Sequence, residues 1–161
     1  MKRTLLSALF LTFSFGVFSQ VQNVTFEVSP NPFQENETIT ITASDVDPSA
    51  WGVTDIYLWA WSSVGGVEQD APNNGEWTNS NEAQKLTNNG NGTYSISFVP
   101  SEFYGRTNLE TIGFLVKAKD GTGDKKSQDA VYAVGTIEVP PVTEAPVPAG
   151  MKDGINFDPN D

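Results

Sequence analysis

Short segments in which apolar and polar residues alternate recur along the chain, and they constrain its fold more than any other feature. Each is rich in β-branched or aromatic residues and is bounded by Gly, Asn, Asp or Pro. Because side chains alternate across a β-strand, this pattern is typical of strands with one buried face. No comparable pattern indicates a helix past the first twenty residues. The expected strands are residues 24–28, 38–42, 54–61, 83–87, 93–99, 112–119 and 130–139.

Two turn signals separate the later strands. Asn88-Asn89-Gly90-Asn91-Gly92 combines residues that tolerate the positive φ of tight hairpins, and Asp120-Gly121-Thr122-Gly123-Asp124 is the second. About seven strands with frequent turns predict an all-β fold, an immunoglobulin-like antiparallel β-sandwich over residues 22–139, with three strands in one sheet and four in the other. An open barrel would give a similar pattern and is the alternative.

The first 19 residues are expected to be a secretory signal peptide. Lys2 and Arg3 precede an apolar run over residues 5–18, and Gln20 is the expected first mature residue. The alternative is a membrane anchor, but the run is shorter than the roughly 20 residues that a spanning helix needs. The chain is therefore predicted to be secreted or held at the cell surface, without membrane insertion.

The composition changes at Pro140. Four prolines lie among small residues within 140–150, which indicates a semi-rigid, extended linker. We interpret residues 151–161 as the start of a truncated downstream domain. A flexible tail is the alternative interpretation.

The composition also excludes several kinds of chemistry. The sequence contains no cysteine and no histidine, so it supports neither a disulfide framework, nor His- or Cys-based nucleophilic catalysis, nor a zinc site with N or S ligands. The net charge of −11 disfavours nucleic acid as a partner. A carboxylate pair could hydrolyse glycosides, but nothing singles one out among the 20 acidic residues. The chain is therefore expected to be non-catalytic and to need no cofactor.

The expected strand at residues 54–61 is the most informative segment. Its two faces carry different side chains, because alternate residues point to opposite sides. One face carries the aliphatic side chains Ile56, Leu58 and Ala60. The other face carries the aromatic side chains Tyr57, Trp59 and Trp61. If the aromatic face is open, its rings form a platform on which flat apolar surfaces such as sugar rings can stack. Either set could instead form the core of the sandwich.

Trp77 lies in a polar segment, residues 73–81, among Asn, Glu and Ser side chains. A stacking ring beside hydrogen-bonding groups such as the Asn79 amide suits a sugar site. The alternative is that Trp77 folds back and caps one end of the sandwich.

Several aspartates lie in or near turns and could in principle bind calcium through oxygen ligands. They match no twelve-residue calcium loop, and Asp is a common turn former, so no metal site is predicted. These residues are Asp45, Asp47, Asp120, Asp124 and Asp129.

Four segments together form a pattern that resembles the N-terminal β-sandwich modules of secreted Bacteroidetes proteins, including those that precede alpha-amylase-superfamily glycoside hydrolases. They are residues 56–61, 75–80, 85–87 with 91–94, and 113–121. The resemblance covers about residues 22–161, and residues 151–161 resemble the start of the next sandwich domain in such enzymes. It includes no catalytic barrel and so implies no catalytic residue.

The resemblance implies a starch-related or other polysaccharide context. We therefore expect a non-catalytic accessory module of an exported alpha-amylase-type glycoside hydrolase, which binds a polysaccharide such as an α-glucan. The alternative is a purely structural spacer or a protein-interaction domain. Trp59, Trp61 and Trp77 are the expected stacking residues, with Tyr57 and Asn79 as further carbohydrate-binding residues.

Overall fold

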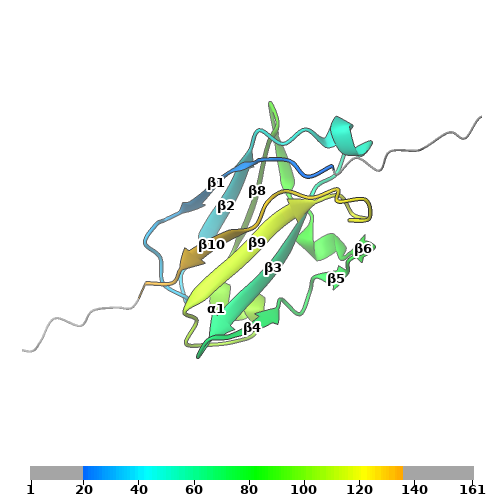
Figure 1. Ribbon diagram of the computed structural model, residues 1–161. Coiled ribbons are helices and arrows are strands. Elements are labelled where there is room, and N and C mark those ends of the chain that lie inside the picture. Colours follow the sequence, from blue (N-terminus) through cyan, green and yellow to red (C-terminus); the bar gives the residue numbers. More distant parts are fainter. Residues whose placement is uncertain (1–19, 136–161) are drawn as a thin grey trace, which may run out of the picture.

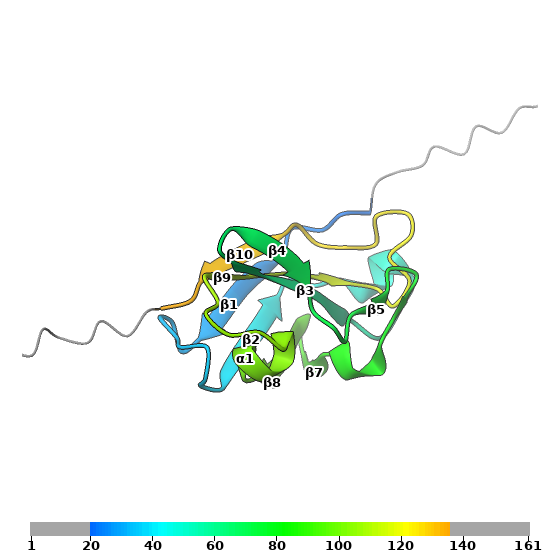
Figure 2. The same ribbon diagram turned by 90° about the horizontal axis from the view of Figure 1, so that it is seen from below.

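Two antiparallel sheets of four strands each pack face to face in the computed structural model, which describes residues 20–135 (Figures 1 and 2). The first sheet has the strand order β1-β2-β8-β7, with β1 at Thr25–Ser29, β2 at Ile39–Ser44, β8 at Thr93–Phe98 and β7 at Thr87–Gly90. The second has the order β10-β9-β3-β4, with β10 at Ala130–Ala133, β9 at Thr111–Lys117, β3 at Tyr57–Val64 and β4 at Val67–Asp70.

The remaining elements are short. A two-stranded ribbon, β5 (Gly75–Glu76) with β6 (Asn79–Ser80), lies beside β3 (Figure 1). Two 3-10 turns, η1 (Pro48–Trp51) and η2 (Glu82–Gln84), and one α-helical turn, α1 (Pro100–Tyr104), connect strands. In residues 20–135 no helix is long and apolar enough to cross a membrane.

The strand order corresponds to the immunoglobulin constant arrangement. There, strands A-B-E-D form one sheet and G-F-C the other. The orders β1-β2-β8-β7 and β10-β9-β3 reproduce these sheets, and β4 adds a fourth strand beside β3. The predicted all-β sandwich is thus confirmed, and the two sheets stay separate instead of closing into the alternative barrel. The predicted three-and-four division is wrong, because each sheet has four strands.

Alternation along the central strands builds the core. In β2, Ile39, Ile41 and Ala43 are fully buried between the sheets, while the intervening threonines are partly exposed. Burying one such aliphatic side chain stabilises the fold by about 1.5–3 kcal/mol. The second sheet meets them with the following buried residues: Ile56, Leu58, Ala60, Ile112, Phe114 and Val116.

Three local predictions were wrong, each for an identifiable reason. The strand predicted at residues 83–87 begins only at its last residue, Thr87, because Asn81 accepts a hydrogen bond from the backbone N–H of Ala83 and caps η2 there. The helical turn α1 was missed; it begins at Pro100 and ends at Gly105, which has φ 61°. Strand β7 extends to Gly90, inside the segment predicted as a turn.

Several expectations lie outside the described residues. They concern the signal peptide at residues 1–19, the linker at 140–150 and the downstream segment at 151–161, together with the end of the strand expected at 130–139.

Candidate functional site

Strand β3 places its two sets of side chains on opposite sides of the second sheet. The aliphatic set faces the first sheet and belongs to the core. The aromatic set therefore points to the outer face, the side of the second sheet turned away from the first. Pairing with β9 sets three outer-face neighbours across the strands: Tyr57 opposite Lys117, Trp59 opposite Leu115, and Trp61 opposite Gly113.

Trp61 occupies space that a side chain on β9 would otherwise fill. Its indole lies over Gly113, and a Cβ atom added there would overlap the ring. Gly113 is buried, and its φ lies outside the left-handed region, so glycine is needed there for space and not for backbone conformation. The absence of a side chain lets Trp61 lie low across the sheet while staying partly exposed.

Trp59 and Trp77 pack against each other above Leu115. Their ring centroids lie 5.2 Å apart with an interplanar angle of 75°, which is the edge-to-face arrangement that aromatic pairs favour. Leu115, beneath the groove, is only 4% exposed. Both indoles stay partly exposed.

Lys117 places a buried positive charge beneath this pair. Its Nζ lies 5.7 Å from the centroid of Trp59 and 4.9 Å from that of Trp77, within the range of cation–π attraction. It also donates hydrogen bonds to Ser80 Oγ at 2.7 Å and to the carbonyl of Lys119 at 2.9 Å. Burial lowers the pKa of Lys117 to about 8, against the opposing effect of Asp120.

The loop that carries Trp77 is held to β3 by a buried amide. Asn74 Oδ1 accepts from the backbone N–H of Ala60 at 3.1 Å, and its Nδ2 donates to the Ala60 carbonyl at 2.8 Å. Gln84 Nε2 donates to the same Oδ1. Strand β4 ends at Asp70. Beyond that residue, the Asn74 side chain makes the hydrogen bonds to β3 that a neighbouring strand would otherwise make, and it thereby fixes the loop.

A second contact fixes Trp77 from the other side. Its carbonyl accepts from the backbone N–H of Gly121 at 3.0 Å. A Cβ atom at Gly121 would come within 2.6 Å of the indole Cε2, so this position, like Gly113, leaves room for a ring. The turn expected at residues 120–124 therefore also supports the site.

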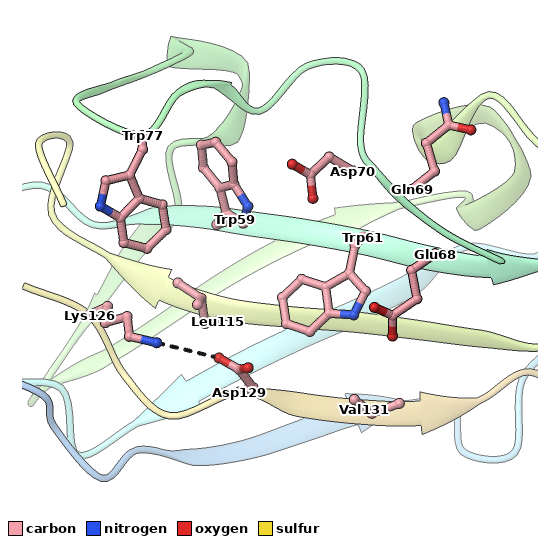
Figure 3. Close-up of a pocket in the computed structure, with 10 residues that line it drawn as sticks. All are labelled: Trp59, Trp61, Glu68, Gln69, Asp70, Trp77, Leu115, Lys126, Asp129 and Val131. Atoms are coloured by element: carbon pink, nitrogen blue, oxygen red, sulfur yellow. Dashed lines mark ion pairs between the residues drawn. The ribbon is translucent and has the colours of Figure 1, made fainter. Parts of the chain in front are cut away.

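These side chains border an open groove of about 630 Å³ on the outer face (Figure 3). Trp59, Trp61 and Trp77 were predicted as stacking residues, and the fold brings all three together in this groove. The remaining lining residues come from β4, β9, β10 and the preceding turn: Glu68, Gln69, Asp70, Leu115, Lys126, Asp129 and Val131.

The groove is predominantly acidic. Asp70 lies directly across the strand pair from Trp61, and Glu68 is opposite Ser63 on the same face. At the other edge, Lys126 Nζ lies 3.7 Å from the Asp129 carboxylate (Figure 3). Three carboxylates against one ammonium group leave an excess of negative charge around the rings.

Two predicted site residues are not part of the groove. Tyr57 is 2% exposed, and its hydroxyl donates to Glu82 at 3.2 Å; burial, followed by this carboxylate, raises its pKa. Asn79 is exposed but pairs with Glu76 in the β5–β6 ribbon and does not line the groove. Residues of η2 and those just after it thus contact Tyr57, whereas Trp59 and Trp61 on the same strand stay partly exposed.

Sequence reasoning missed Glu68 and Asp70, although a signal for them exists. Gly65-Gly66 is a two-residue hairpin turn, with φ values of 59° and 74°. Because Val64 then pairs with Val67, the register places Asp70 opposite Trp61. The signal was overlooked because all four residues of β4 are exposed and show no alternation.

Three of the five aspartates considered as calcium ligands accept hydrogen bonds from other groups of the chain. Asp47 accepts hydrogen bonds at the start of η1, Asp45 accepts one from Thr25 Oγ1, and Asp120 accepts one from the N–H of Thr122. Over residues 20–135, no group of three or more acidic side chains is arranged to hold a metal ion.

No protein-family profile and no curated protein matches the chain. An assignment of function therefore rests on the groove, its chemistry and the sequence patterns.

Proposed function

We propose that this protein is a non-catalytic carbohydrate-binding module and that its groove binds a polysaccharide such as an α-glucan. One observation carries the proposal: three of the four tryptophans gather in an open groove on the outer face of the sandwich. A sandwich that needed these rings only for its core would bury them between the sheets, where Ile56, Leu58 and Ala60 lie instead.

The groove combines the two features that sugar recognition requires. Indole rings offer flat apolar faces to the C–H surfaces of a pyranose, and their N–H groups can donate hydrogen bonds. Carboxylate and amide oxygens at the rim, from Glu68, Gln69 and Asp70, can accept hydrogen bonds from hydroxyl groups. The volume of about 630 Å³ lies within the range of small-ligand sites, which suits a short stretch of glycan.

Within an enzyme, such a groove would act by proximity. A shallow site of this kind binds weakly by itself, but tethering to a catalytic domain raises the effective concentration of substrate near that domain. We further propose that the module is exported and precedes an alpha-amylase-type glycoside hydrolase. This part rests on the sequence patterns at residues 1–19 and 140–161 and on the resemblance of residues 22–161.

Affinity electrophoresis in gels that contain soluble starch tests the proposal. We expect retardation of the wild type, and about tenfold weaker binding for Trp61→Ala and for Trp77→Ala, because each loses a stacking face. Trp51→Phe is the matched control: Trp51 is 2% exposed in the core, and its indole N–H donates to the Gln20 carbonyl. Circular dichroism verifies that each variant is folded.

The result also separates the proposal from a structural spacer. The spacer has one observation in its favour, since Trp59 and Trp77 pack on each other above the nearly buried Leu115. Unretarded wild-type protein, on starch and on a panel of other polysaccharides, would favour the spacer and overturn the proposal. Retardation that is lost equally in Trp51→Phe would place binding away from the groove.

A further inference from the structure

The three indoles of the groove are not equivalent. Trp59 and Trp77 engage each other edge to face, and both receive the Lys117 ammonium group. Among the described residues, Trp61 forms neither an aromatic pair nor a cation–π contact. Its inner side lies over Gly113, which leaves its other side toward the groove.

Two carboxylates flank this ring. Asp70 pairs directly across from Trp61 in the β3–β4 register, and Glu68 is two positions away on the same face of the sheet. In Figure 3, Glu68 lies beside the nitrogen end of the Trp61 indole, and Asp70 lies above the ring, toward Trp59. Both residues are exposed, and in the described part of the chain neither forms an ion pair or a side-chain hydrogen bond. Their oxygens are therefore available to a ligand that rests on the ring.

We propose that Trp61, Glu68 and Asp70 form the principal sugar subsite of the groove and that this subsite selects uncharged glycans over polyanionic ones. The assignment rests on the proposed function. A neutral pyranose stacks on the Trp61 face, and its hydroxyl groups donate hydrogen bonds to the two carboxylates. Hydrogen bonds to an ionised acceptor are stronger than those between neutral groups, so these carboxylates orient the sugar.

The same charges repel a uronate or a sulfated sugar. Lys126 is the one cation that lines the groove within residues 20–135, and it already pairs with Asp129. An anionic ring on Trp61 would thus face Glu68 and Asp70 without a compensating positive charge. Like charges at contact distance disfavour binding, most strongly at low ionic strength.

The test compares a charge-neutral double variant with a matched control. Glu68→Gln/Asp70→Asn retains the shape and polarity of the rim but removes both charges. Glu27→Gln/Glu102→Gln changes the net charge equally at exposed residues of β1 and α1, outside the groove. Isothermal titration at low salt measures binding of a maltooligosaccharide and of an oligogalacturonate to each protein.

We expect the wild type and the control to bind the neutral oligosaccharide and to reject the anionic one. In the groove double variant, affinity for the neutral ligand should fall about tenfold, and the ratio of neutral to anionic affinity should fall by at least the same factor. Equal binding of both ligands by the wild type would overturn the subsite. So would a double variant that behaves like the control.

These failures differ from failure of the proposed function. If the wild type binds neutral glycans but Glu68→Gln/Asp70→Asn has no effect, the groove still binds carbohydrate and only the subsite assignment is wrong. If the wild type binds no glycan while remaining folded, both proposals fail.

Discussion

A lysine is an unusual residue to find fully buried, and Lys117 shows what can compensate its charge. No carboxylate pairs with it in the described residues; two hydrogen-bond acceptors and two indole rings surround the ammonium group instead. Burial still disfavours the charged form, which is why the pKa of Lys117 falls to about 8. Asp120 is the charged group that acts on Lys117, and it opposes burial by raising this pKa.

Lys117 should therefore make stability depend on pH in the alkaline range. Between pH 8 and 10.5, the ordinary pKa of a lysine, the unfolded chain binds more protons at this residue than the folded chain does. The free energy of unfolding therefore rises with pH across this interval. Compared with Lys117→Met, the wild type should gain about 1–2 kcal/mol between pH 7.5 and 9.5 in urea titrations.

Lys117→Arg serves as the control, because a guanidinium group stays protonated throughout this range. Its stability relative to Lys117→Met should not change with pH. If the wild type also shows no change relative to Lys117→Met, Lys117 titrates at its ordinary pKa and the burial argument is wrong.

At the scale of the element, the segment from Ala71 to Gln84 decides what the outer face can do. It begins where β4 ends, follows the edge of β3 and carries Trp77 over the sheet. Its regular structure is limited to two two-residue strands and one 3-10 turn, so backbone pairing alone does not hold it. The Asn74 side chain supplies the missing attachment.

Removing that attachment should release Trp77. Asn74→Ala leaves the N–H of Ala60 buried without an acceptor and should lower the free energy of unfolding by about 2–3 kcal/mol. Near-ultraviolet circular dichroism should show loss of the signal from the Trp59–Trp77 pair. Asn73→Ala, at the exposed neighbouring residue, should change stability by less than about 0.5 kcal/mol. Equal effects at both positions would contradict the role given to Asn74.

This segment also marks where the sequence stops being informative. The central strands were predictable because alternation in β2 and β3 reflects the different surroundings of their two faces, and because β9 is a largely apolar segment that is buried on both faces. The aromatic set was placed on one face of β3 for the same reason. The alternation did not predict which face would be open, or that Tyr57 would be covered while Trp61 was not. Both depend on a loop held by the Asn74 amide and by backbone hydrogen bonds to Lys119 and Gly121. Alternation carries no information about such a contact.

Glu68 and Asp70 illustrate a different limit. Their position was implied by the hairpin at Gly65-Gly66, yet β4 has no buried residue to reveal a strand. The segment forms an edge strand because its backbone pairs with β3, and its hydrophobic pattern does not indicate a strand. The alternation of apolar and polar residues therefore could not predict that these two side chains line the groove beside the tryptophans.

For the whole molecule, the second sheet serves two purposes at once. Its inner face completes the core with the first sheet, and its outer face carries the groove. Gly113 has no side chain, which leaves space for the Trp61 indole on the outer face. Its neighbours Ile112 and Phe114 are buried in the core. Substitutions in the groove can thus alter binding without disturbing the packing between the sheets.

This separation leads to a prediction about the domain itself. Residues 20–135 contain both sheets, the core cluster and the ten residues named above as lining the groove. A protein of this span alone should therefore unfold in one cooperative urea transition, as expected for a domain with a single core. Its affinity for a maltooligosaccharide, measured by isothermal titration, should equal that of the full chain. A second transition, or affinity that falls more than about threefold, would mean that residues beyond this span complete the core or the groove.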